Sequence, residues 1–187
     1  SGKMAVCLSQ LYNEHVRGNQ AGYAKFETFP VWNLPLKHPV NKAYEAATAD
    51  LNDVNMIDPY HLEAYGETAI SYNRDTEIFP VLDALFTGIY GHNPYKSPTD
   101  MGVNMVGFCM EDDEACCQAS KQEIIRRYYH ALNDFANGDI SEAVVNRIGR
   151  LFQQVGISTA DRRTTVAANE RKERDNSMAV GAIELHD

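Results

Sequence analysis

Ser1-Gly2-Lys3-Met4-Ala5 opens the chain, and apolar residues then recur at helical spacing, at Met4, Leu8 and Leu11. A small residue, a glycine and a lysine before a helix are typical of the end of a phosphate-binding loop. The free amides of the first turn, the helix dipole and the lysine charge all favour an anion there. The sequence therefore predicts that Ser1, Gly2 and Lys3 contact a phosphate group. It also predicts that the chain begins inside a loop of a longer protein.

The phosphate-loop motif is incomplete. In G-x-x-x-x-G-K-[ST] the final hydroxyl holds Mg²⁺, whereas Met4 occupies that position here. The ligand set for ordinary Mg²⁺-dependent phosphoryl transfer is therefore missing one member. Ser-Gly at the start of a chain is also a common cloning remnant, so three residues alone leave both interpretations open.

The bulk composition is that of a globular protein. The chain has 187 residues, of which 44% are hydrophobic and 23% charged, enough for one domain or parts of two. The net charge of −9 is opposite to that of a nucleic-acid-binding surface and disfavours anionic membranes. No apolar run approaches the roughly 20 residues of a membrane span, and no signal peptide is recognisable. We expect a cytoplasmic protein with no nucleic-acid or membrane partner.

The four cysteines are Cys7, Cys109, Cys116 and Cys117. Adjacent cysteines make a poor disulfide scaffold in a chain of this size, so we expect free thiols in a reducing compartment. No C-x-x-C pair or suitably spaced histidine accompanies them. The sequence therefore predicts no metal site. The sequence does not identify a cofactor, but the opening motif is compatible with a nucleotide.

The spacing of apolar residues organises the chain into helices with few strands. Helices are predicted over 3–16, 40–51, 59–65, 67–89, 119–137 and 140–155, with Pro80 kinking or splitting the fourth, and a further helix opens at Ser158. Strands are predicted over 22–29 and from Met178 to Leu185, while 54–57 fits either a strand or a turn.

These elements predict an α/β fold that is mostly helical. Residues 1–58 are expected to be the C-terminal part of a Rossmann-like or P-loop-like α/β unit. Residues 59–175 are expected to form a helical domain, and residues 176–187 the first strand of another α/β domain.

Lys25 and Glu27 are candidate ligand contacts. They alternate with Tyr23 and Phe29 along the predicted strand, so they share one of its faces. Ligands of open α/β sheets bind at the carboxyl ends of strands, which is where this pair falls. A surface ion pair explains the same two residues equally well.

Residues 97–105 mix hydroxyls, an acid, an amide and a glycine within apolar surroundings. Loops of this kind often carry function, which makes Thr99, Asp100 and Asn104 further ligand candidates. The alternative is a structural corner in which Thr99 or Asp100 caps a helix at Met101. For Asp58-Pro59-Tyr60-His61-x-Glu63, capping by Asp58 is favoured over acid–base or metal chemistry.

Several long segments resemble a bacterial family of uncharacterised proteins, domain of unknown function 1846. The likeness is strong to about residue 130 and looser beyond. The segments that carry it are Ser1–Ala5, Gly22–Asn33, Ala46–Leu51, Asn55–Pro59, Ser97–Phe108 and Ser120–Tyr129.

The resemblance implies a longer protein with sequence on both sides of this chain. Members carry a Pro- and Gly-rich loop before Ser-Gly-Lys, which implies that Ser1 is native sequence. Pro stands in that loop where a phosphate loop has its first Gly. The resemblance also implies an α/β part, a helical part and a second α/β part. It supplies no reaction, and so no catalytic residue.

Two hypotheses of function follow. In the first, the protein binds a nucleotide or another phosphorylated small molecule at the helix start, with Lys25, Glu27, Thr99, Asp100 and Asn104 completing the site. In the second, it is a non-catalytic, homo-oligomeric assembly module. The second rests on aromatic residues that would either line an interface or fill the core. These are Tyr128, Tyr129, Phe135 and Phe152.

Overall fold

The structure is a computed structural model that describes residues 2–27, 29–104, 106–176 and 180–185. Its contacts divide the chain into two compact units, each built from two stretches of sequence. The first unit comprises Ser1–Leu36 and Asp53–Glu111, and the second comprises Lys37–Asn52 and Asp112–Asp187. This division differs from the predicted boundaries near residues 58 and 176. The reason is that residues 37–52 pack with helices that follow much later in the chain.

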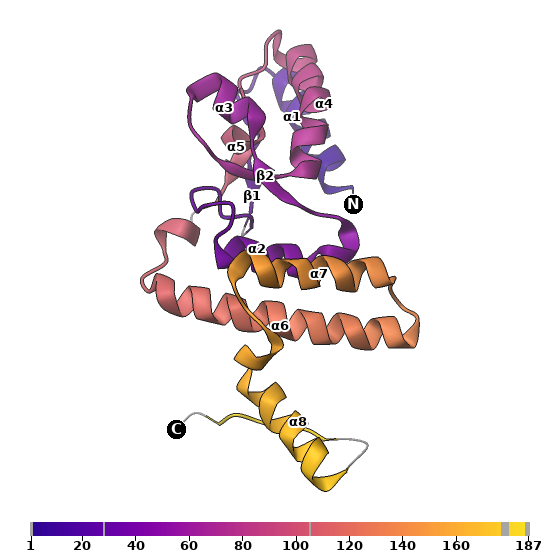
Figure 1. The fold of residues 1–187 in the computed structure, drawn as a ribbon. Helices are drawn as coiled ribbons and strands as arrows, with labels where there is room; N and C mark the ends of the chain where they lie inside the picture. Colours follow the sequence, from indigo (N-terminus) through magenta and orange to yellow (C-terminus); the bar gives the residue numbers. More distant parts are fainter. Residues whose placement is uncertain (1, 28, 105, 177–179, 186–187) are drawn as a thin grey trace. The chain divides into compact units, whose positions relative to one another are not determined.

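The first unit carries all four strands of the described residues. The elements in chain order are α1 (Lys3–Val16), β1 (Lys25–Phe26), β2 (Asn55–Ile57), α3 (Pro59–Tyr65), β3 (Ile70–Tyr72), α4 (Asn73–Tyr90), α5 (Pro98–Met101), β4 (Gly102–Val103) and the short 3₁₀ turn η2 (Val106–Phe108). Of the four strands, β1 and β2 are labelled in Figure 1. β1 pairs in parallel with β4, with Lys25 opposite Gly102, and β2 pairs antiparallel with β3, with Asn55 opposite Tyr72.

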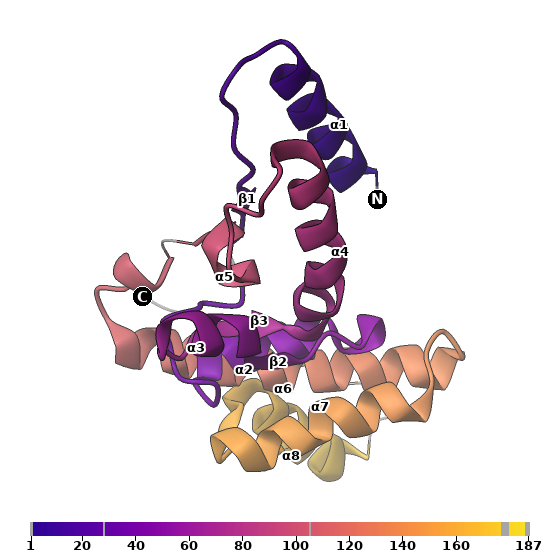
Figure 2. The same ribbon diagram turned by 90° about the horizontal axis from the view of Figure 1, so that it is seen from above.

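Packing of α1 against α4 forms the core of this unit. The two helices lie side by side in both views (Figures 1 and 2). Leu11 of α1 meets Phe79, Leu82 and Phe86 of α4, with Met101 of α5 beside them, and each is at most 5% exposed. Burying an apolar side chain of this size contributes about 1.5–3 kcal/mol, so this cluster fixes the position of α1.

The second unit is helical. Its elements are α2 (Pro39–Ala47), η1 (Ala49–Leu51), α6 (Asp113–Asn137), α7 (Glu142–Val155), η3 (Thr159–Asp161) and α8 (Arg163–Asp175). Ile124, Ile148 and Leu151 form the centre of its core, and the small side chains of Ala46 and Ala131 let α2, α6 and α7 approach closely. The three helices lie together in Figures 1 and 2.

The aromatic residues of α6 and α7 divide between core and surface. Tyr128 and Phe152 pack against the core, with ring centroids 5.0 Å apart. Tyr129 and Phe135 are 36% and 43% exposed. Of these four aromatic residues, only Tyr129 and Phe135 are exposed enough to line an interface. The assembly hypothesis stays a prediction.

Several helix predictions are confirmed. α1 and α3 have the predicted limits. α6 and α7 end at Gly138 and Gly156, whose positive φ angles of 82° and 65° suit glycine. Residues 55–57, which fitted a strand or a turn, form β2.

Other predictions are wrong in extent or type. Of the described residues in the strand predicted over 22–29, only Lys25–Phe26 form a strand. In the helix predicted over 67–89, residues 70–72 instead pair as β3, and α4 then runs unbroken through Pro80. Residues 180–185 of the predicted final strand form no strand, because no described segment pairs with them; Met178 lies outside the described residues.

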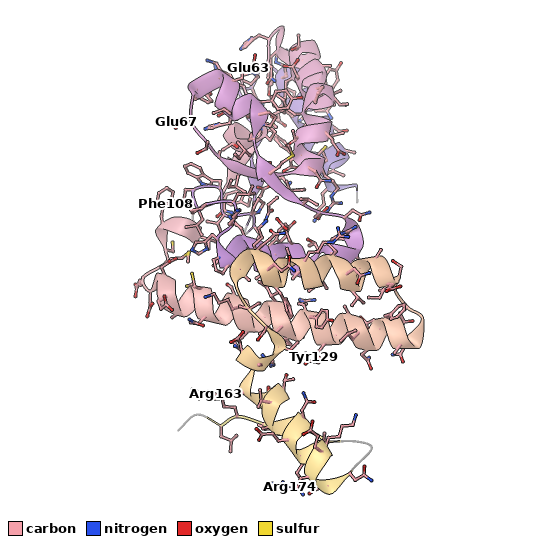
Figure 3. All side chains as sticks on the ribbon, in the orientation of Figure 1. Glu63, Glu67, Phe108, Tyr129, Arg163 and Arg174 are labelled. Atoms are coloured by element: carbon pink, nitrogen blue, oxygen red, sulfur yellow. The ribbon has the colours of Figure 1, made fainter. Side chains whose placement is uncertain are left out.

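The fold is therefore mostly helical with two small sheets, a mixed α/β structure. A Rossmann-like or P-loop-like remnant remains a prediction. Among the helices of the described residues, none combines the length and apolar character that a bilayer crossing requires. The charged end of α8 is exposed as predicted, and Figure 3 shows Arg163 and Arg174 projecting from that helix.

Replacing Leu151 with Ala should lower the free energy of unfolding by about 2–5 kcal/mol, because the cavity would lie inside a tightly packed helix interface. Leu51→Ala is the matched control in the same unit, since Leu51 is 54% exposed, and it should cost less than about 1 kcal/mol. Urea denaturation followed by circular dichroism measures both. Equal losses for the two variants would contradict the packing described.

Candidate functional site

A cleft of about 790 Å³ opens in the first unit. This volume lies in the range of small-molecule sites in proteins. Its walls come from the first two turns of α1, from the chain around β1, and from the junction of β3 with α4. The lining residues are Lys3, Met4, Cys7, Tyr23, Ala24, Lys25, Phe26, Tyr72, Arg74, Asp75, Glu77 and Ile78.

A charged cluster around Lys25 forms one wall of this cleft. The Lys25 Nζ lies 2.7 Å from Asp75 Oδ2 and 2.6 Å from Glu27 Oε1. It also donates a hydrogen bond to the Tyr72 hydroxyl and stands 4.7 Å from the centroid of that ring. The two carboxylate side chains are 15% and 17% exposed, so the cluster is largely shielded from water.

Local backbone structure places each member of the cluster. Lys25 begins β1, and Glu27 follows that strand directly. Tyr72 ends β3 and is the residue before α4, so Asp75 falls in the first turn of α4. Negative charge is favoured at that position because the positive end of the helix dipole lies there. The ion pair thus joins two segments 50 residues apart.

Burial sets the protonation behaviour of Glu27. It raises the pKa of Glu27 from 4.5 to about 7; Lys25 opposes that shift, and the nearby Asp75 carboxylate adds to it. For Lys25, burial alone lowers the pKa, but the hydrogen bonds to Asp75, Glu27 and Tyr72 outweigh it and leave the pKa above its ordinary value. Near neutral pH, therefore, Glu27 exchanges a proton while Lys25 stays charged.

The carboxyl ends of β1 and β4 meet beside this cluster. Glu27 follows β1 and Asn104 follows β4, and both line a second, small cavity of about 20 Å³. Thr99 and Asp75 line it too, and Asp75 also lines the large cleft. Lys25 and Glu27 lie side by side at the strand end, as expected, and they form the ion pair that was the alternative explanation, although it is half-buried. Their contact with a ligand stays a prediction.

The opening turn of α1 forms another part of the cleft wall. Gly2 is the residue before α1; no side chain caps this end and its first turn holds no acid. Lys3 is exposed and, among the described residues, makes none of the ion pairs. Within the part of the chain that the structure describes, no carboxylate caps this helix start or pairs with the Lys3 ammonium. Ser1 lies outside the described residues.

The other predicted contacts already have protein partners. Thr99 donates from its amide and its hydroxyl to Asp58. Asp100 accepts hydrogen bonds from the Tyr65 hydroxyl and the Lys96 amide. Asn104 donates to the Pro30 carbonyl and accepts from the Val106 amide.

These bonds shape a structural corner, and Ser97 rather than Thr99 or Asp100 caps its helix, α5. Asp100 lines neither cavity among the described residues. Contact between ligand and Thr99, Asp100 or Asn104 stays a prediction.

Asp58 has the capping role predicted for it. Its buried carboxylate accepts hydrogen bonds from the amides of Tyr60 and His61, at the start of α3. His61 Nδ1 lies 3.0 Å from the Ser97 hydroxyl, and both residues are buried away from the two cavities. Glu63 is exposed on α3 (Figure 3). This segment therefore serves the fold.

Of the residues that line the cleft, the sequence identified only Lys3 and Lys25 as candidates. Tyr72, Arg74 and Asp75 fall within the stretch predicted as a helix over 67–89, and all three line the cleft. Arg74 also pairs with the buried carboxylate of Asp53, at 2.6 Å. One sequence signal could have identified these residues. It is a strand followed directly by a helix with an acid in its first turn.

The chain belongs to the family described as "Domain of unknown function DUF1846, N-terminal", whose model matches residues 1–156. It is 60% identical over 187 residues to a UPF0371 protein of Corynebacterium urealyticum. It is also 60% identical over 185 residues to UPF0371 proteins of Streptococcus pneumoniae and Streptococcus thermophilus. Each alignment covers at least 99% of this chain and 37% of the relative. The resemblance seen in the sequence is thereby confirmed along the whole chain.

Replacing Glu27 with Gln should remove a pH dependence of stability. The folded-state pKa of about 7 lies above the ordinary 4.5, so the protonated acid favours folding. This contribution, about 2–3 kcal/mol, is full below pH 4.5 and is lost as the pH rises through 7. Urea titrations at intervals from pH 4.5 to 8 should show wild-type stability falling relative to the variant.

Glu77→Gln controls for removal of a negative charge, because Glu77 is exposed on α4 and also lines the cleft. It should keep the wild-type slope. Parallel curves for wild type and Glu27→Gln would show that Glu27 has an ordinary pKa.

Proposed function

We propose that this region binds a phosphorylated small molecule, such as a nucleotide, in the 790 Å³ cleft. One observation carries the proposal: the opening turn of α1 and the Lys25 cluster, far apart in sequence, line the same cleft. The helix start at Lys3 and the strand end beside Lys25 each point to a ligand for a separate reason. A helix start with a lysine is suited to an anion, and the end of a strand is suited to a ligand.

The distribution of charge favours Lys3 as the contact for an anionic ligand. Lys3, Lys25 and Arg74 line the cleft together with the carboxylates of Asp75 and Glu77. Lys25 is paired with Asp75 and Glu27, and Arg74 is paired with Asp53. Lys3 is therefore the cation best placed to receive a phosphate, together with the amides of the first turn of α1.

The Lys25 cluster would have a different role. Its ammonium is committed to Asp75 and Glu27, so it would orient the remainder of a ligand rather than bind the phosphate. Tyr72 and Tyr23 provide aromatic surface in the same wall, which suits a nucleobase or another flat group. The apolar side chains of Met4 and Ile78 extend that surface.

Ligand-induced thermal stabilisation of the full-length protein tests the proposal. Nucleotides, sugar phosphates and inorganic phosphate are added in turn, and at least one should raise the melting temperature. Lys3→Ala should weaken that ligand about 10- to 100-fold, because a charge-assisted hydrogen bond to phosphate is lost.

Lys37→Ala is the matched control, since Lys37 is an exposed lysine of the second unit, and it should bind as the wild type does. A melting curve that none of the phosphates shifts, or a shift that Lys3→Ala leaves intact, would overturn the proposal.

A further inference from the structure

Three side chains of different ligand type converge in the second unit, apart from the cleft. Donor atoms of His38, Asp113 and Cys117 all lie within 4.8 Å of one another. His38 Nε2 is 3.0 Å from Asp113 Oδ1, and the Cys117 sulfur is 3.5 Å from His38 Nε2 and 3.7 Å from Asp113 Oδ2. Imidazole, carboxylate and thiolate are the ligands that zinc uses in proteins.

These distances fit a tetrahedral ion. With Zn–S near 2.3 Å and Zn–N or Zn–O near 2.0–2.2 Å, neighbouring donors in a tetrahedron stand roughly 3.3–3.6 Å apart. The two separations from the Cys117 sulfur are already close to this range. The contacts of Asp113 with His38 and Cys117 come from different carboxylate oxygens, so this exposed carboxylate has to turn and present one oxygen to the ion.

Helix geometry holds the three ligands in place. Asp113 and Cys117 are four residues apart on α6, so they lie on one face of that helix. His38 is the residue before α2, and α2 packs along α6 (Figure 1). The His38 side chain is only 11% exposed, whereas that of Asp113 is 64% exposed. A fourth ligand position therefore faces solvent, where water can occupy it.

The surroundings favour a cation. Asp112, Asp113 and Glu114 are consecutive acids at the start of α6. The Asp112 carboxylate caps the helix through the Ala115 amide, which offsets the positive end of the helix dipole. The negative charge of these acids thus outweighs the positive end of the helix dipole close to the three ligands.

We propose that His38, Asp113 and Cys117 bind a divalent ion of the zinc class, with water as fourth ligand. In the structure, His38 Nδ1 accepts a hydrogen bond from the Val40 amide, at 3.3 Å. The proton of the neutral ring therefore lies on Nε2, facing Asp113. Metal binding at Nε2 moves this proton to Nδ1 and releases the thiol proton of Cys117 to the buffer. The long bond from Val40 is given up for metal–ligand bonds, which are far stronger.

Zinc affinity of the full-length protein, measured by competition with a chromophoric chelator, tests this site. One ion should bind per chain, and Co²⁺ in its place should give a thiolate-to-cobalt charge-transfer band. Cys117→Ser should abolish the band and weaken zinc at least about tenfold, since even outer partners of metal ligands cost that much. Cys116→Ser is the matched control and should leave both readouts unchanged.

His38→Asn separates the ligand role from the capping role. Asparagine is a good helix cap, so α2 should keep its start while the imidazole is lost. Circular dichroism checks that the variant is folded, and its zinc affinity should fall as for Cys117→Ser. Wild-type protein that takes up no zinc, or equal affinity in wild type and Cys117→Ser, would overturn the proposal. So would a cobalt band that depends on Cys116 instead.

Discussion

The ion pair between Lys25 and Asp75 is the interaction on which the candidate site depends. It joins the short strand β1 to the first turn of α4 across 50 residues of sequence. β1 has only two residues and one partner strand, so its backbone hydrogen bonds alone would hold it weakly. Because the pair is half-buried and the Tyr72 hydroxyl completes it, one ammonium both fixes the wall of the cleft and opposes the rise that burial causes in the pKa of Glu27.

Buried charges elsewhere in the first unit follow the same rule, that each must have partners. The Asp58 carboxylate is fully buried, and its two oxygens accept hydrogen bonds from the start of α3 and from Thr99 of α5. It therefore joins α3 to α5, and Pro98 and Thr99 of α5 line the small cavity beside Glu27. A buried carboxylate left without these donors would cost several kcal/mol, which explains why the corner around α5 uses so many polar side chains.

Much of the fold could be predicted from local patterns, because caps and stops are local. The limits of α1 and α3, the cap at Asp58 and the ends at Gly138 and Gly156 follow from residues within a few positions of each. β3 could not be predicted in this way, since it is defined by pairing with β2 and interrupts a sequence that has helical periodicity. The predicted strand after residue 176 failed for the converse reason: residues 180–185 have apolar side chains but no partner among the described segments.

The candidate sites show the same limit. Lys25 and Glu27 are two residues apart, so a strand pattern could place them together, whereas Asp75 joins them only through the fold. His38 and Cys117 are 79 residues apart, and no ligand-spacing rule for metal sites covers such a separation. Sequence spacing recognises sites built on one element; sites built between elements become visible only once the helices are packed.

Charge in the cleft links the protonation of Glu27 to the kind of anion that would bind. Below pH 7 Glu27 becomes neutral, and the Lys25 cluster then gains one positive charge relative to its state at higher pH. A phosphate monoester changes in the opposite sense, because its second ionisation has a pKa of about 6 and its charge grows as the pH rises. The two titrations oppose each other, so the attraction between cleft and phosphate varies little near neutrality. A permanently charged sulfate ester lacks the compensating titration and would be held better on the acid side. The Glu27 carboxylate would thus give phosphate and sulfate esters different pH dependences of binding.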